Sequence, residues 1–452
     1  MRGLRSTIAL VVVLVGLGGY IYFVTWKKPE ADTGTKQEKV FAGVQSDKID
    51  ELTITSGKGE KTTLKKDGSA WQVTSPISAK ADESEVSGIT SNLSSVEVTR
   101  VIDDKPANLK EYGLETPRVE VDFKAAGDKE PRRLFLGDKS PTGSSVYAKR
   151  NAENRVFLIP AFQDTAFDKS SFDLRDKTLV KFDRDKVDGI ELTADGKTTA
   201  LTKDGSDWKL TKPLQTKADF GSVEGLIGRM QSAQMKSIVT AEPTPADLKK
   251  YGLDKPSETV TLDLGSARAV VELGGKAEDN TIYARDTARP IVMTVESSLA
   301  DELKKGADDY RRKDVFEFRA FNATHIELTR NGQTVAFDKT KNTGKDAQTN
   351  PDIWKRVSPS AKDANKDTMD ALLSRLSNMR ATSFVASTAG TGLDKPALVV
   401  DVKFDDGKKE ERVTFGQNGS DTYASRPGEP GGAKVDTADF TDVIKSLDEL
   451  AK

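Results

Sequence analysis

The chain has 452 residues, in which 69 Lys and Arg side chains nearly balance 71 Asp and Glu side chains, and it contains no Cys. This balance excludes a domain-wide basic excess, so the composition gives no reason to expect nucleic-acid binding. The absence of Cys excludes disulfides, thiol catalysis and thiolate metal sites.

The N-terminus is predicted to be a membrane anchor. Arg2 and Arg5 precede an uncharged, largely apolar run over residues 7–26, and Lys27 and Lys28 follow it. Twenty helical residues span about 30 Å, the thickness of the bilayer core. A cleaved secretory signal is the alternative, but the run is long and no small-residue cleavage site follows it. We therefore expect a single transmembrane helix.

The predicted topology places most of the chain outside the cytoplasm. Positive charge is nearly equal on the two sides of the span, so the orientation rests on the absence of a second span in the sequence. Residues 1–6 are expected in the cytoplasm and residues 7–26 in the membrane. Residues 27–38 are polar and aperiodic, which predicts a linker.

Three copies of one sequence pattern follow this linker. Each copy contains Trp-x-x-x-x-Pro, beginning at Trp71, Trp208 and Trp354. The period of about 140 residues is that of a whole small domain and is far longer than a solenoid unit. The predicted modules are residues 39–177, 178–314 and 315–452.

A helix is predicted after each Trp segment. Apolar side chains recur there at spacings of three and four, which places them on one helix face. Asp82 and Asp219 directly precede the first two helices and are predicted to be N-caps. The apolar positions are Val86, Ile89 and Leu93 in the first copy, Val223, Leu226 and Met230 in the second, and Met369, Leu372 and Leu376 in the third.

The other segments indicate antiparallel strands. Residues 47–55 and 185–193 alternate apolar with polar side chains, and residues 326–329 follow the same pattern. Asp-Gly and Asn-Gly pairs between such segments are typical of tight hairpins. The fold class is therefore α+β, with three tandem modules that are each a sheet meander with one packed helix. Two Gly-rich, Pro-rich or polar insertions, at 341–351 and 427–432, predict longer loops in the third copy.

No catalytic, cofactor-binding or metal-binding residue is predicted. His325 is the only His, so a Ser-His-Asp triad cannot recur in each module, and we expect His325 to be structural or solvent-facing. Residues 183–194 have the wrong spacing for a calcium loop. Gly196-Lys197-Thr198 lacks the earlier Gly of a phosphate loop, so a hairpin turn is expected there.

The three Trp side chains allow two interpretations. They form either a repeated aromatic platform for a ligand or the core anchor of each module. The second interpretation is better supported, because each Trp lies on a predicted strand before a helix with matching apolar positions. The binding residues of the protein, if there are any, are not indicated by the sequence.

Further motifs accompany the Trp residues in the first two copies. Tyr-Gly-Leu-x-x-Pro ends at Pro117 and Pro256, Leu-Gly-Asp ends at Asp138, and Tyr-Ala begins at Tyr147 and Tyr283. With the predicted anchor, this combination resembles the bacterial domain-of-unknown-function family DUF4340. The resemblance implies a membrane-anchored envelope protein, often encoded beside an ABC-transporter permease and a gliding-motility-type auxiliary subunit. It implies no catalytic residues.

The expected function is therefore that of a non-enzymatic accessory subunit of an ABC-type transport or gliding-motility-related system. It would be anchored by a single pass in the bacterial inner membrane, with most of the chain periplasmic or extracytoplasmic. One alternative is a module that binds envelope glycan or lipid, which predicts a concave pocket in each module. A second is a carboxylate-dependent hydrolase, which needs a close carboxylate pair in a cleft.

Overall fold

The computed structural model describes residues 38–343, 348 and 352–452. The predicted anchor at residues 7–26 lies outside these residues, as do residues 1–6 and 27–37. Within the described part of the chain, no helix combines the length and apolar character that a membrane crossing requires. The chain forms two compact units, one ending at Lys177 and one beginning at Thr178.

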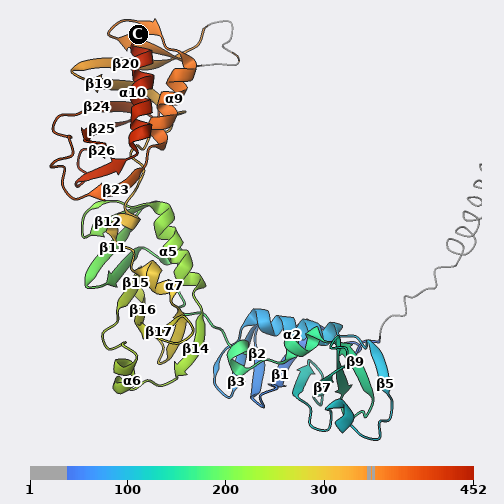
Figure 1. The fold of residues 1–452 in the computed structure, drawn as a ribbon. Coiled ribbons are helices and arrows are strands. Elements are labelled where there is room, and N and C mark those ends of the chain that lie inside the picture. The colour runs from blue at the N-terminus through green and yellow to red at the C-terminus, as the bar shows by residue number, and fades with distance from the viewer. Residues whose placement is uncertain (1–37, 344–347, 349–351) are drawn as a thin grey trace, which may run out of the picture. The chain divides into compact units, whose positions relative to one another are not determined.

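Three nine-stranded sheets with few helices make up the fold (Figure 1), so the prediction of three repeated modules is confirmed. All paired strands are antiparallel. The strands of the first sheet are β1 (Ile49–Thr55), β2 (Lys61–Asp67), β3 (Ala70–Ser75), β4 (Ala79–Lys80), β5 (Arg100–Asp103), β6 (Val119–Ala125), β7 (Arg132–Lys139), β8 (Ser145–Arg150) and β9 (Val156–Pro160).

The same element order recurs in the second and third sheets. The second sheet contains β10 (Gly189–Ala194), β11 (Lys197–Asp204), β12 (Asp207–Lys212), β13 (Thr216–Lys217), β14 (Met235–Thr240), β15 (Glu258–Leu264), β16 (Ala267–Lys276), β17 (Thr281–Asp286) and β18 (Val292–Glu296). The third contains β19 (Ala323–Arg330), β20 (Gln333–Lys341), β21 (Asp352–Ser358), β22 (Lys362–Asp363), β23 (Ala381–Val385), β24 (Leu398–Phe404), β25 (Lys409–Asn418), β26 (Asp421–Ser425) and β27 (Gly432–Val435).

Each sheet consists of two meanders joined at the centre. The first sheet has the order β4-β3-β2-β1-β6-β7-β8-β9-β5, and the other two sheets repeat it. The chain therefore completes one meander, passes through a helix and an edge strand, and returns beside its first strand. The three helices are α2 (Glu83–Ser95), α5 (Phe220–Ser232) and α9 (Lys366–Asn378).

Those three helices form where the sequence pattern places them. All nine apolar positions predicted for the helix faces are buried. Asp82 accepts hydrogen bonds from Ser84 N and Glu85 N, and Asp219 accepts one from Ser222 N. These side chains satisfy amide groups that have no partner within the helix. The predicted helix faces and N-caps are confirmed.

The Trp side chains are core residues. Trp71, Trp208 and Trp354 have exposed fractions of 6%, 1% and 8%. Each lies on a strand that ends directly before the repeated proline, and that proline follows a cis peptide bond in all three copies. The interpretation of the Trp residues as core anchors is supported by this burial.

Two of the repeated motifs pack on each other. The Tyr-Gly-Leu motif begins at the last residue of the short helix η3 (Lys110–Tyr112) in the first repeat and directly after α6 (Pro245–Lys250) in the second. A Cβ atom at Gly137 would collide with the carbonyl oxygen of Tyr112, so only glycine fits in the Leu-Gly-Asp motif. The Tyr112 and Tyr147 rings also contact each other, at 5.1 Å between centroids.

The prediction of one helix per module is incomplete. The first two repeats end in pairs of short helices, α3 (Phe162–Phe167) with α4 (Ser171–Leu174) and α7 (Ser298–Leu303) with α8 (Ala307–Tyr310). The third repeat ends in the long helix α10 (Thr437–Ala451), which packs beside α9. These elements cover core surface that the sheet and the first helix leave open.

Candidate functional site

The only histidine of the chain lies on the surface of the third sheet. His325 Nδ1 is 2.5 Å from Asp338 Oδ1 on the neighbouring strand, and His325 Nε2 is 3.0 Å from Glu327 Oε1. Partial burial lowers the pKa of His325, but the hydrogen bonds to Asp338 and Glu327 outweigh it, so the pKa is raised above 6.5. The imidazole is thus held between two carboxylates, consistent with a structural role.

The other motifs examined for chemistry have structural roles. Asp183 caps the short helix η4 (Arg184–Lys186), and Asp188 accepts a hydrogen bond from Gly265 N at 3.1 Å. Gly196 has a φ of 72° in the turn between β10 and β11, as expected of a tight hairpin. Among the described residues, no group of three or more potential ligands is arranged to hold a metal ion.

A cluster of charged side chains lies where the second repeat meets the third, and we call it the junction cluster. The segment that connects the two repeats is short, and residues at both of its ends form β-bridges. Arg311 forms an isolated β-bridge with Ala218 of the second repeat, and Asp314 forms one with Arg380 of the third. The segment 311–314 therefore changes its pairing from one repeat to the next. The cluster comprises Lys217, Arg311, Arg312, Glu317, Glu411, Arg426 and Glu429.

Glu317 joins side chains of both repeats. Its Oε1 atom is 2.5 Å from Lys217 Nζ in the second repeat and 2.9 Å from Arg312 Nη1 in the connecting segment. Burial raises the pKa of Glu317, but the hydrogen bonds from Lys217 and Arg312 outweigh this effect and lower the pKa to about 2. Glu317 is therefore ionised across the physiological pH range.

A second carboxylate holds the backbone of the same segment. Glu411 on β25 accepts hydrogen bonds from Glu317 N and Phe318 N, with its shorter contact to each at 2.8 Å. Burial raises the pKa of Glu411 despite these bonds. Arg426 Nη1 approaches Glu317 Oε1 at 3.9 Å, and burial lowers the pKa of Arg426. The connecting segment is thus fixed through both its side chains and its amides.

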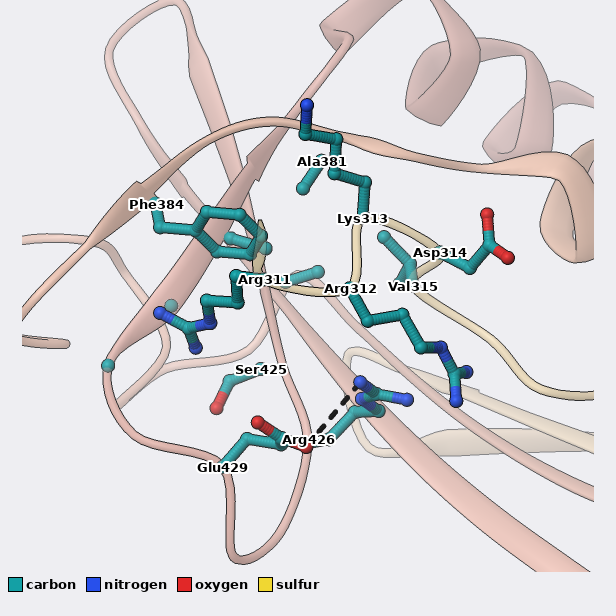
Figure 2. Close-up of a pocket in the computed structure, with 14 residues that line it drawn as sticks. Arg311, Arg312, Lys313, Asp314, Val315, Ala381, Phe384, Ser425, Arg426 and Glu429 are labelled. Carbon is teal, nitrogen blue, oxygen red and sulfur yellow. Dashed lines mark ion pairs between the residues drawn. The ribbon is translucent and has the colours of Figure 1, made fainter. Parts of the chain in front are cut away.

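The loop between β26 and β27 completes the junction. Arg311 Nη2 donates to Pro430 O at 2.6 Å, and its guanidinium lies 4.2 Å from the centre of the Phe384 ring. The hydroxyl of Thr216 in the second repeat donates to Glu429. Figure 2 shows Arg311 beside Phe384, and the ion pair of Arg426 with Glu429. This loop lies in the predicted insertion at 427–432, so a feature specific to the third copy contacts the second.

Packing around Arg311 leaves little free space at the junction. The cavity among Arg311, Phe384 and Arg426 has a volume of about 30 Å³, roughly the share of one water molecule in the liquid. A cavity of this size cannot admit a sugar or a lipid chain. On this side, the junction cluster is therefore suited to fastening two modules together.

Arginines also bind the backbone at the start of the first and second repeats. Arg150 Nη1 donates to Val40 O at 2.5 Å in the first repeat. In the second repeat, Arg289 Nη2 donates to Thr178 O at 3.0 Å and also to Leu179 O. Arg150 and Arg426 both lie three residues after the tyrosine of a Tyr-Ala motif. The spacing in the sequence could have indicated Arg150 and Arg426, but not Arg289, which lies six residues after Tyr283.

Comparisons with known proteins identify a family by sequence. A family model described as a domain of unknown function, DUF4340, matches residues 71–209 and 208–396, which together exceed half of the chain. The first match begins in β3 and ends in β12, so its ends do not coincide with those of a sheet. No curated protein matches the chain significantly.

One solved structure aligns along most of the chain without sharing its fold convincingly. It is a crystal structure of the DNA polymerase sliding clamp from Pseudomonas aeruginosa with ligand, 9% identical, and the alignment covers 88% of this chain and 93% of that one. The TM-score of 0.17 is too low to establish a common fold, so nothing is inferred from this similarity.

Proposed function

Because the chain belongs to the DUF4340 family, we propose that it is a non-enzymatic, membrane-anchored envelope protein that acts as an accessory subunit of an ABC-type transport or gliding-motility-related system. The link to a transporter derives from the family resemblance. The predicted anchor at residues 7–26 would hold the chain in the bacterial inner membrane by a single pass, with the repeats extracytoplasmic.

The junction cluster is the observation that carries this proposal. Residues 178–452 form one compact unit, in which Glu317 and the loop at Glu429 join the second repeat to the third. Two modules fastened in this way hold any partner surfaces on them at a fixed separation. Such a body suits an accessory subunit that must present its surfaces to other components.

The hydrolase alternative gains no support from the carboxylates at the junction. Glu317 is bound by Lys217 and Arg312, and Glu411 accepts backbone amides. A hydrolytic pair needs free carboxyl groups on either side of a substrate, with several ångströms between them. Both carboxylates border a hollow of about 570 Å³, but their hydrogen bonds leave neither of them free.

Affinity purification of the full-length protein from native membranes in mild detergent tests the proposal. Mass spectrometry should identify an ABC permease and its ATPase among the partners. The control lacks residues 1–26 and should lose these partners if the anchor brings the protein to the complex. A partner set without transporter components, or one equally enriched with the control, would contradict the proposal.

Glu317→Lys supplies a matched second variant. It reverses the charge between Lys217 and Arg312, and should weaken partner recovery if the fixed pair of repeats presents the binding surface. The control is Asp448→Lys, which reverses a charge paired with Arg330 at 2.7 Å, away from the junction. Equal recovery with both variants would show that the junction does not matter for assembly.

A further inference from the structure

The third repeat has a hollow beside its core Trp that differs from the corresponding region of the second repeat. It lies between β20, β21 and α9, has a volume of about 550 Å³, and is bordered by Phe321, Trp354 and Asp370. This volume is within the range of small-molecule sites, about 300–1,000 Å³.

In the second repeat, an ion pair covers the equivalent Trp. Trp208 Nε1 donates to Glu224 Oε1 at 3.3 Å, and Glu224 Oε2 is paired with Arg184 Nη2 at 2.8 Å. The repeat alignment places Ala320 at the position of Arg184 and Asp370 at that of Glu224. Both replacements shorten the side chain, so the Arg–Glu pair cannot form above Trp354.

The third repeat also presents an aromatic ring at the rim of this hollow. Phe321 is 77% exposed, whereas the second repeat has Asp185 at the equivalent position. The turn that carries Phe321 is held on both sides: Lys339 Nζ donates to Phe321 O at 2.9 Å, and Asn322 Nδ2 donates to Asp405 Oδ1 at 2.8 Å. An exposed ring on a fixed turn loses little conformational entropy when a ligand stacks on it.

The charges around the hollow indicate the class of ligand. Lys339 and Lys366 balance Asp352 and Asp370, so the border has no net formal charge. Lys339 and Asp352 interact at 3.8 Å. A charged ligand would be attracted by the side chains of opposite charge and repelled by those of like charge. A neutral molecule with hydroxyl groups can both donate to Asp and accept from Lys. The aromatic side chains offer an apolar surface to one face of such a molecule.

We propose that this hollow in the third repeat binds a neutral saccharide, with one sugar ring stacked on Phe321 and its hydroxyl groups hydrogen-bonded to Asp370 and Lys339. A pyranose ring combines a flat, CH-rich face with a hydroxyl-bearing edge, and so matches this arrangement. The site is distinct from the junction cluster and does not depend on the proposed association with a transporter.

Binding is tested on the full-length protein in a detergent without a sugar headgroup. The probes are the tetramer of N-acetylglucosamine and maltotetraose, and isothermal titration calorimetry gives the affinity. Phe321→Ala should weaken binding by about fivefold, because stacking on an aromatic ring contributes roughly 1 kcal/mol. The matched control is Phe162→Ala, which removes a ring that is 63% exposed in the first repeat and should leave the affinity unchanged.

A second variant closes the hollow without removing its aromatic ring. Ala320→Arg combined with Asp370→Glu recreates the ion pair of the second repeat and should abolish binding while circular dichroism and the melting temperature stay unchanged. A pull-down with purified cell-wall sacculi distinguishes a polymeric source of the sugar from a free oligosaccharide. The proposal is overturned if neither tetramer binds at millimolar concentration, or if binding survives both Phe321→Ala and the double variant.

Discussion

The sheets of the second and third repeats have the same strand order, but the two repeats end in different helices. The second repeat ends in α8 and then passes through Arg311, which pairs with Ala218 before the chain enters the next module. The third repeat instead ends in α10, whose terminal carbonyls at Leu450 and Ala451 accept hydrogen bonds from Arg356. The two repeats thus close the same side of their sheets with different elements: two short helices in the second and one long helix in the third.

The Trp residues of the second and third repeats offer the test with the largest expected effect. Trp208 is almost fully buried under an ion pair, so Trp208→Ala should cost about 3–5 kcal/mol of unfolding free energy. Trp354 lies beside a hollow, and Trp354→Ala should cost less, about 2–3 kcal/mol. Urea unfolding of the full chain, followed by hydrogen exchange in each repeat, measures the two values. An equal or larger loss for Trp354 would contradict the proposed difference in packing.

The second prediction concerns the contact between Arg356 and the end of α10 in the third repeat. Arg356 is 6% exposed and donates to Ala451 O at 2.6 Å, Ser360 O at 3.1 Å and Leu450 O at 3.2 Å. Arg356→Met should destabilise the docking of α10 by about 2–3 kcal/mol, since the hydrogen bonds of the charged guanidinium to the terminal carbonyls of α10 are lost. Amide exchange in α10 should accelerate accordingly. The control Lys445→Met alters an exposed charge of α10 and should change exchange little.

Acidification should weaken the junction cluster. The pKa of Glu317 in the folded protein is about 2, below its ordinary value of 4.5. Ionised Glu317 therefore stabilises the fold at pH values above 4.5, and this contribution disappears as the pH falls through about 2. Glu317→Gln should cost about 2 kcal/mol at neutral pH, after allowance for its partial exposure.

The unfolding free energies of the wild type and Glu317→Gln, compared across this acid range, measure that contribution. Their difference should narrow as the pH falls. A difference that stays constant on acidification would show that the lost stability comes from packing and not from charge.

The smallest effect concerns His325, which has no counterpart in the other repeats. Its raised pKa means that protonated His325 adds stability below pH 6.5, and that this gain is lost as the pH rises through the folded pKa. The gain should be below about 1 kcal/mol for a partly exposed pair. NMR titration is direct because the chain has a single His. Asp338→Asn should move the pKa back towards 6.5; an unchanged titration would exclude Asp338 as a cause.

Local features of the fold were predictable because short-range rules determine them. The burial of Val223, Leu226 and Met230 follows from helical spacing, and the positive φ of Gly196 follows from the hairpin signal. Helix α10 could also have been predicted, because Phe440, Val443 and Leu447 recur at the same helical spacing. The strand order was not predictable, since the pairing of β1 with β6 depends on contacts far apart in sequence.

The junction cluster illustrates why long-range sites were missed. Nothing near Glu317 in the sequence indicates that Lys217 will lie 2.5 Å away, because the two residues belong to different repeats. The same holds for the hollow at Trp354, which is recognised only when Ala320 and Asp370 are compared with Arg184 and Glu224 in space. The second repeat serves as the reference that shows which side chains are missing above Trp354 in the third.

The offset between the family match and the sheets has a practical consequence for fragment design. A recombinant piece cut at residues 71–209 would begin with β3 and omit β1 and β2. Since β1 separates β2 from β6 at the centre of the sheet, the piece would expose the backbone edges of both β3 and β6. Open edges of this kind promote aggregation. Boundaries for expression should therefore follow strand pairing, and not the ends of the sequence match.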